Sequence, residues 1–184
     1  MTESVSEFLL QWNPDDVLKK WPGHTKKIPY AVDALVNHSG IKDNSGLHDY
    51  FNDYFASNFE KIEKKIVISA GDVNTGEYVP FTEAEGFENL GWLIQASTSC
   101  PPVTPTIYKD KLLMDGGTIW NIDIDYALDR CREKVADDEH IIMDIIIVNY
   151  ESFSDIETTG TTRENMDRIK DMQAYYKRIN DVAE

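Results

Sequence analysis

The stretch Leu112-Leu113-Met114-Asp115-Gly116-Gly117 joins a short apolar run directly to an acidic residue and two glycines. The end of a strand is where α/β folds present reactive groups. The two glycines let the backbone turn sharply and leave space beside the Asp115 carboxylate, which could accept a proton or bind a cation there. A plain turn is the alternative, because Asp-Gly is among the commonest turn pairs. We expect Asp115 at a strand end, in a cleft, with a positive φ or a close backbone contact at Gly116 or Gly117.

Other apolar runs along the chain predict further strands. The β-branched run Ile66-Val67-Ile68 lies in a strand expected over 65–70, and Asn74-Thr75-Gly76 is the turn that follows it. The other expected strands cover 77–81, 106–108, 111–114 and 141–148. The runs at 66–68 and 141–148 are almost wholly apolar, so we expect both of their faces to be buried.

Apolar residues at helical spacing predict helices between and around these strands. The expected helices cover an initial segment that ends at Pro22-Gly23, then residues 31–37, 47–55, 88–98 and 124–135, and a long final helix that opens with the capping box Thr161-x-x-Glu164. Strands alternate with helices, so the fold class is α/β. The polar residues 151–160 predict a solvated loop.

Composition and charge exclude several classes of protein. The 184 residues fit one domain, and a net charge of −15, spread through every segment, disfavours nucleic acid and strong attachment to anionic membranes. No run of 18 apolar residues occurs, so no transmembrane segment is expected. The N-terminus lacks the basic start and apolar core of a secretory signal. We therefore expect an intracellular protein, cytoplasmic or organellar, with Cys100 and Cys131 as free thiols.

The histidines and acidic residues give no metal or cofactor site. The four histidines are isolated, without metal-ligand spacing. Asp123, Asp125 and Asp129 lack the spacing and the glycine of a calcium loop, so they are expected to be helical or solvated acids.

The order of the motifs around Asp115 resembles that of the patatin-like phospholipase family. Upstream, Ala96, Ser97 and Pro101 fit a helix that ends in Ala-Ser-x-Ala-x-Pro. Downstream, Asn121 begins a segment that leads into a helix, although Asp123 stands where the family usually has proline. Residues 68–77 are similar to the family's strand and Thr-Gly-Glu-like turn, and residues 40–51 are similar to its Gly-Leu-x-Asp-x-x-x-Leu segment. The resemblance covers about residues 12–148.

The resemblance implies a serine hydrolase of lipid acyl esters that works with a Ser-Asp dyad. In the family the serine lies in a Gly-x-Ser-x-Gly elbow, the aspartate is its base, and a glycine-rich loop supplies the oxyanion hole. Asp115 matches the dyad aspartate, with Gly116, Gly117 and Asn121 as supporting motif residues. The implied fold is a three-layer sheet with helices on both faces, present as a partial domain over 1–150. A loop and a C-terminal amphipathic helix follow over 151–184.

The nucleophile of that dyad is missing from the sequence. Neither Gly-x-Ser-x-Gly nor a glycine-rich loop occurs, and in the family both precede the position of residue 1. The sheet is therefore expected to be incomplete at its N-terminal strands. Ser69, Ser97 and Ser99 lack the flanking glycines that an elbow nucleophile needs, and ordinary packing or capping is expected of them.

Three functions remain open at this point. The chain can be a module of a lipid acyl hydrolase, inactive alone, whose Asp115 serves a serine on another segment. It can instead be a non-catalytic pseudoenzyme that acts as a structural subunit of a larger assembly, or a small-molecule binding domain that reuses the cleft at Asp115. Strands without neighbours predict another polypeptide as a partner, and a completed site would take a lipid or another acyl ester.

Overall fold

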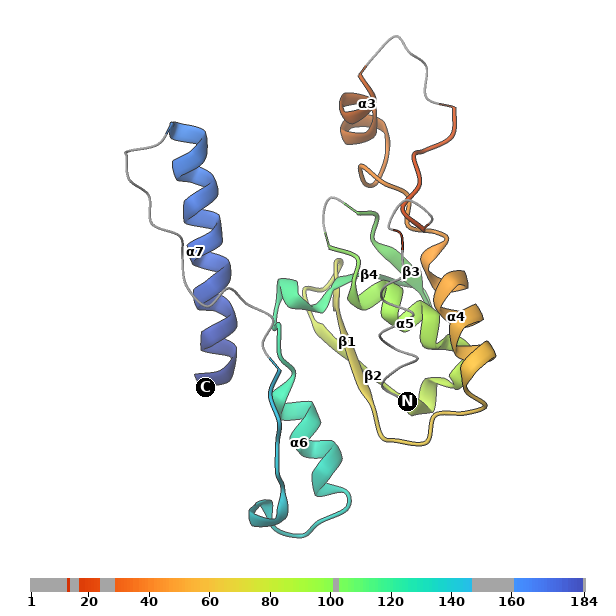
Figure 1. The fold of residues 1–184 in the computed structure, drawn as a ribbon, viewed down its shortest axis with the longest axis vertical. Helices are drawn as coiled ribbons and strands as arrows, with labels where there is room; N and C mark the ends of the chain where they lie inside the picture. The colour runs from red at the N-terminus through yellow and green to blue at the C-terminus, as the bar shows by residue number, and fades with distance from the viewer. Residues whose placement is uncertain (1–12, 14–16, 24–28, 101–102, 147–160, 184) are drawn as a thin grey trace. The chain divides into compact units, whose positions relative to one another are not determined.

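The computed structural model describes residue 13 and residues 17–23, 29–100, 103–146 and 161–183 (Figure 1). Contacts divide the chain into two compact units, Met1–Thr118 and Ile119–Glu184, and each is described by itself. The division at residue 150 that the family resemblance implies stays a prediction. Most of the expected initial helix, and the loop expected over 151–160, lie outside the described residues.

The first unit contains a four-stranded antiparallel sheet. Its strands are β1 (Val67–Asp72), β2 (Tyr78–Thr82), β3 (Thr106–Tyr108) and β4 (Lys111–Asp115), in the order β2-β1-β4-β3. All three pairings are antiparallel. Four of the five strands expected from the sequence are thereby confirmed, and the fold is mixed α/β.

Two tight turns build the sheet as a pair of hairpins. Lys109 and Asp110 join β3 to β4 with φ of 47° and 63°. Two successive left-handed residues are what a type I′ turn requires, and this turn matches the twist of a hairpin. Between β1 and β2, Gly76 supplies a φ of 74°. The buried Asp72 closes that turn by accepting the N–H of Asn74 at 2.9 Å.

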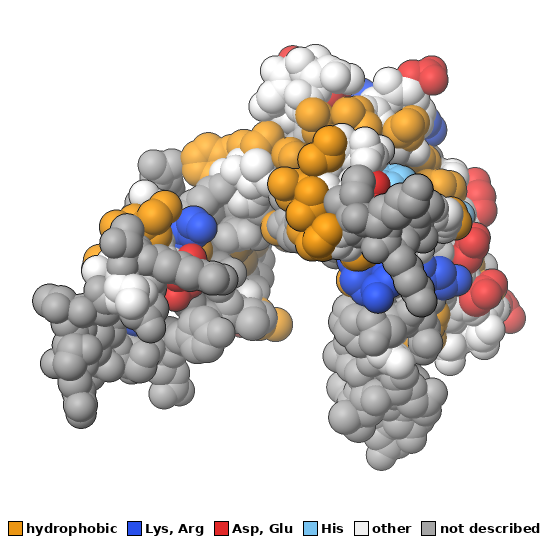
Figure 2. Space-filling view, turned by 90° about the horizontal axis from the view of Figure 1, so that it is seen from above, with side chains coloured by type: hydrophobic (Ala, Val, Ile, Leu, Met, Phe, Trp, Pro, Cys, Tyr) orange, Lys and Arg blue, Asp and Glu red, His pale blue; other side chains and the backbone are white. Residues whose placement is uncertain are grey.

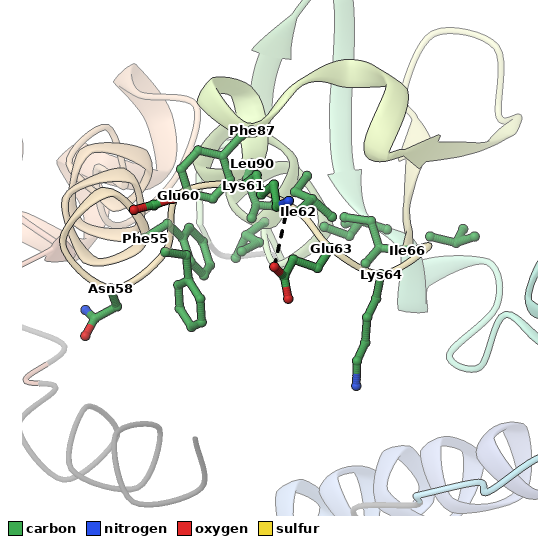
Figure 3. Close-up of a pocket in the computed structure, with 14 residues that line it drawn as sticks. Phe55, Asn58, Glu60, Lys61, Ile62, Glu63, Lys64, Ile66, Phe87 and Leu90 are labelled. Carbon is green, nitrogen blue, oxygen red and sulfur yellow. Dashed lines mark ion pairs between the residues drawn. The ribbon is translucent and has the colours of Figure 1, made fainter.

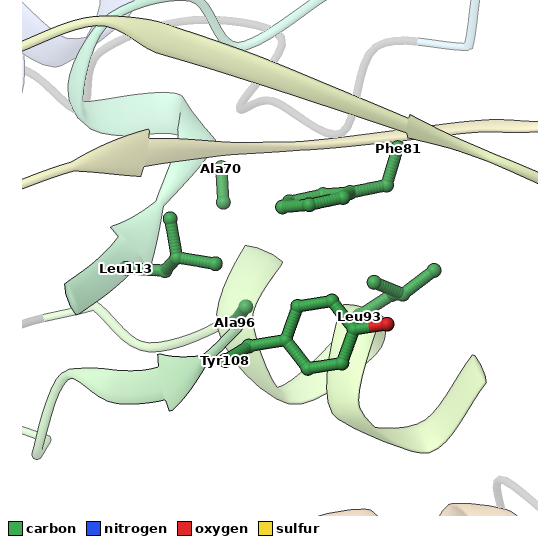
Figure 4. Packing of buried hydrophobic residues seen from close by; sticks show 6 residues of the cluster. All are labelled: Ala70, Phe81, Leu93, Ala96, Tyr108 and Leu113. Atoms are coloured by element: carbon green, nitrogen blue, oxygen red, sulfur yellow. The ribbon is translucent and has the colours of Figure 1, made fainter. Parts of the chain in front are cut away.

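Helix α5 (Leu90–Ser97) covers one face of the sheet and makes the core with it. Leu93 and Ala96 point from the helix toward the strands, where they meet Ala70, Phe81 and Leu113 (Figure 4). The ring of Tyr108 closes the cluster, edge-on to Phe81 with 5.7 Å between ring centroids. Leu93 and Leu113 are 1% and 0% exposed, so this contact is the centre of the first unit.

Helix α4 (Leu47–Asn58) packs on α5, and Gly91 sets the distance between the two helices. The Gly91 N–H donates to Asn52 Oδ1 at 2.9 Å. A Cβ atom at Gly91 would lie 2.4 Å from the carbonyl oxygen of His48, so only glycine fits. Helix α3 (Tyr30–Asn37) precedes α4, and short 3₁₀ turns cover Glu83–Glu85, Phe87–Asn89 and Gly116–Thr118.

The second unit contains α6 (Ile124–Arg132), a 3₁₀ turn (Asp138–His140) and α7 (Thr162–Ala183). Asp123 caps the N-terminus of α6, and its carboxylate accepts the N–H of Tyr126 at 3.3 Å. Both helices were expected from their spacing and are confirmed. None of the helices in the described ranges combines the length and the apolarity that crossing a membrane requires.

The strand expected over 141–148 is wrong for the part that the structure describes, residues 141–146, which have no regular structure. Ile142 and Ile146 are 92% and 86% exposed there, so the expected burial is also wrong. The physical reason is pairing: a strand needs a neighbour for its backbone groups, and the described part of the second unit contains helices and no strand. An apolar run alone does not supply that neighbour. Residues 147–148 lie outside the described residues.

Several large apolar side chains are exposed, and hydrophobic side chains gather on part of the face drawn in Figure 2. On α3, Val32, Leu35 and Val36 are 50%, 73% and 73% exposed. On α7, Met166, Ile169 and Met172 are exposed at a spacing of three residues. These stripes contrast with the closely packed core between α5 and the sheet.

Candidate functional site

Asp115 is the last residue of β4, as the sequence predicts. Its backbone N–H donates to the carbonyl of Ser99 at 3.2 Å, which ties the strand end to the chain just after α5. Its Oδ1 accepts the N–H of Gly117 at 2.8 Å. The carboxylate is therefore half-buried and held in one orientation by the backbone that follows it.

Gly116 permits this turn through a close backbone contact. A Cβ atom there would lie 2.5 Å from the carbonyl oxygen of Ser69 on β1, so no other residue fits without a shift. Neither Gly116 nor Gly117 is among the described residues with positive φ. The sequence prediction of a close contact is thus confirmed, and the reason for glycine here is steric.

The structure brings Cys100 to Asp115. The thiol lies close enough to the Asp115 carboxylate for the negative charge to act on it, although Cys100 as a whole is exposed. Burial of the sulfur raises the pKa of the Cys100 thiol first, and the negative charge and hydrogen bond of Asp115 raise it further. A nucleophilic atom thus lies beside the Asp115 carboxylate. Nothing in the sequence pairs Cys100 with Asp115, so this contact was not predicted.

Ser99 is a structural residue, as expected. It is 1% exposed, its hydroxyl donates to the carbonyl of Gln95 at 2.6 Å, and it lies 2.9 Å from the hydroxyl of Thr106. Asn44 Nδ2 donates to the same hydroxyl at 3.0 Å. An oxygen with three polar contacts in the interior is not available for attack on a substrate. Ser69 is also buried, in β1, and Ser97 is the last residue of α5.

A buried polar cluster under the strand end was not predicted. Asn44 is 2% exposed, and besides Ser99 it reaches the carbonyl of Thr104 at 3.1 Å. Gln95, 3% exposed, accepts the N–H of His48 at 3.0 Å. Asn44 thus joins the segment before α4 to the chain between α5 and β3, and Gln95 joins the start of α4 to α5. The sequence did not indicate this buried cluster, since Asn44 was expected only to precede a helix.

The remaining sequence candidates fall outside this arrangement. Asn121 is exposed and belongs to the second unit, so its part in the motif stays a prediction. Asp123 caps α6, and Asp129 pairs with Arg132 at 3.0 Å, which confirms the interpretation of these acids as helical. No group of three metal-binding side chains occurs within the described residues. The large cavity of the first unit does not include Asp115 in its lining, so the cleft expected there also stays a prediction.

The geometry defines what the site can do. A fixed carboxylate at a strand end, with a hydrogen-bond donor beside it, can orient a hydroxyl or thiol and accept its proton. Compared with protein-family profiles and with curated proteins, the chain matches none.

Proposed function

We propose that this chain is a module of a patatin-like lipid acyl hydrolase and that Asp115 is the aspartate of its Ser-Asp dyad. The observation that carries the proposal is the orientation of the carboxylate at the end of β4: one oxygen is held by Gly117, and a nucleophilic side chain lies beside it. The order of motifs around Asp115-Gly116-Gly117 supports the same family.

The proposal includes the finer features of that family. The fold would be the three-layer sheet with helices on both faces, of which this chain contributes the later strands. A serine in a Gly-x-Ser-x-Gly elbow and the oxyanion donors would come from another segment or chain, and the substrate would be a lipid or another acyl ester. An intracellular location fits the two free thiols, Cys100 and Cys131.

The pairing of β1 is consistent with a strand from elsewhere. On β1, Ala70 to Asp72 pair with β4, whereas Val67 and Ile68 pair only with β2 among the described strands. An added strand would continue the ladder beside Val67 and Ile68.

Activity of the chain alone and of a completed enzyme tests the proposal. We expect the chain alone to hydrolyse neither a short-chain ester nor a phospholipid, since the nucleophile and the oxyanion donors dominate acyl transfer. Together with a polypeptide that carries the Gly-x-Ser-x-Gly segment, it should gain esterase activity. Asp115→Asn should lower that activity by about 10²- to 10⁴-fold.

Asp110→Asn is the matched control, since Asp110 is an exposed acid in the turn before β4. Its activity should equal that of the unsubstituted protein. A complex that assembles but hydrolyses no ester would favour the alternative, a structural pseudoenzyme. Turnover by the chain alone that Asp115→Asn abolishes would contradict the missing nucleophile.

A further inference from the structure

The first unit contains an apolar cavity whose lining does not indicate an occupant. It has a volume of about 630 Å³ and lies between the end of α4, the segment before β1 and α5 (Figure 3). Its rim carries both signs of charge, on Glu60, Lys61, Glu63 and Lys64, so it favours neither an anionic nor a cationic ligand. The apolar face of α7 in the second unit is different, because its spacing and its charge both indicate a partner.

The apolar residues of α7 follow the spacing of a coiled coil. Four of them lie three, four and three residues apart, and they are Ile169, Met172, Tyr176 and Ile179. This is the a and d pattern of a heptad repeat. Ile169 and Met172 are 54% and 43% exposed, so the face is open to water where the structure describes its side chains. Since a helix gains most of its stability by packing such a face, this one fits a second helix.

The charge of α7 favours a copy of the same helix as that partner. Its 22 residues include five basic and four acidic ones, whereas the whole chain has a net charge of −15. The positions that flank the a and d residues are occupied by Met166, Arg168, Gln173 and Tyr175, and only Arg168 is charged. Charges at these positions select a different partner helix or keep identical helices apart. Because they are almost absent here, α7 is a segment through which two acidic chains can meet.

We propose that α7 pairs with α7 of a second copy in a two-stranded coiled coil, with Ile169 and Met172 in the contact between the two helices. At a rise of 1.5 Å per residue the helix is about 33 Å long, which provides about three heptads for the pairing. The interface does not use Asp115, so it stands or falls independently of the proposed hydrolase.

Sedimentation equilibrium of the full chain tests the pairing. Every protein in the comparison carries Leu35→Glu and Val36→Lys, so that association through α3 does not contribute. We expect a monomer–dimer equilibrium. Ile169→Glu together with Met172→Glu should raise the dissociation constant at least about tenfold, because charges replace apolar side chains in the contact. Lys170→Glu changes the net charge by the same amount at an exposed position outside the a and d pattern, and it should leave the constant unchanged.

A mixing experiment tests whether the same face of both copies meets. Ile169→Lys together with Met172→Lys should weaken the dimer as the two glutamates do. When the glutamate and lysine variants are mixed in equal amounts, they should form a heterodimer, since opposite charges then face each other whichever way the helices run. The proposal is overturned if the chain is a monomer at every concentration, or if the glutamate variant dimerises like its parent. It is equally overturned if the mixture associates no more than its components, since another partner would then cover this face.

Discussion

At the scale of single residues, the contact between Cys100 and Asp115 allows the charge of the Asp115 carboxylate to be detected through the reactivity of the Cys100 thiol. The charge and hydrogen bond of Asp115 contribute to the raised pKa of the Cys100 thiol. Because the thiolate is the species that reacts with alkylating reagents, removing the charge should increase the reactive fraction.

We predict that Asp115→Asn makes Cys100 react faster with iodoacetamide at pH 8. The site of alkylation is read by peptide mass spectrometry, which separates Cys100 from Cys131. Cys131, exposed on α6, is the internal control, and its rate should not change. An unchanged rate at Cys100 would mean that the carboxylate does not face the thiol in solution.

Asp72 accepts hydrogen bonds both from the turn after β1 and from Lys111, so its charge should affect the stability of the fold. The N–H of Asn74 lowers the pKa of Asp72, and a hydrogen bond from Lys111 Nζ at 3.2 Å lowers it further, against the opposing effect of burial. A carboxyl group with a lowered folded-state pKa stabilises the fold above its unfolded pKa of about 3.9. That stabilisation is lost as the pH falls through the folded-state pKa.

We therefore expect Asp72→Asn to be less stable than the unsubstituted chain at pH 6 in urea unfolding. The difference should narrow as the pH falls below the unfolded pKa and through the lower folded-state pKa, because Asp72 then loses its charge. Asp53→Asn, at an exposed position on α4, is the control and should give no pH-dependent difference. A gap that stays constant from pH 6 to pH 3 would show that the charge of Asp72 is not involved.

At the scale of elements, the close contact of α4 with α5 requires a residue without a Cβ atom at position 91. A Cβ atom at Gly91 would meet the backbone of His48, which cannot move aside as a side chain can. We predict that Gly91→Ala destabilises the protein by about 1–3 kcal/mol in urea unfolding, despite the better helix propensity of alanine.

Gly46→Ala is the matched control for this change. Gly46 precedes α4 with φ of −84°, and the nearest atom to an added Cβ there is 3.8 Å away. Gly46→Ala should cost less than Gly91→Ala, because the backbone there is right-handed and an added Cβ meets no atom closer than ordinary van der Waals contact. If both substitutions changed the free energy of unfolding equally, close packing at Gly91 would not be the cause.

Local sequence patterns predicted most elements of the first unit because their causes are local. The β-branched run at Ile66–Ile68, the turn at Gly76 and the spacing of apolar residues in α4 each act within a few residues. The pattern at 141–148 was equally apolar but failed over 141–146, since burial and pairing depend on a distant neighbour. For the same reason the position of Asp115 could be predicted, whereas its contact with Cys100 could not.

At the scale of the whole molecule, exposed apolar surface predicts association. Leu35 and Val36 on α3 are both 73% exposed, and among the described strands Val67 and Ile68 of β1 pair only with β2. Surfaces of this kind drive pairing with another chain. We expect the purified chain to show concentration-dependent light scattering.

The contribution of α3 can be separated from that of the sheet. Leu35→Glu together with Val36→Lys should reduce the scattering, whereas Ser57→Glu together with Ala56→Lys, at exposed positions on α4, should not. A monodisperse monomer that unfolds cooperatively would contradict the prediction and would show that the sheet needs no partner.

The hairpin arrangement of the sheet also determines which strand pairing costs the most chain entropy during folding. In each hairpin the paired residues are close in sequence, as Gly71 and Tyr78 are, so little chain has to be closed into a loop. Among the strand pairings of the sheet, only that of β1 with β4, where Ala70 meets Asp115, closes a long loop, and that loop contains α5. Within the sheet, the cost of chain closure is thus concentrated in one pairing, and it rises only slowly with loop length. The strand end that carries Asp115 is completed in that same event, so the candidate site exists only once the two hairpins have joined.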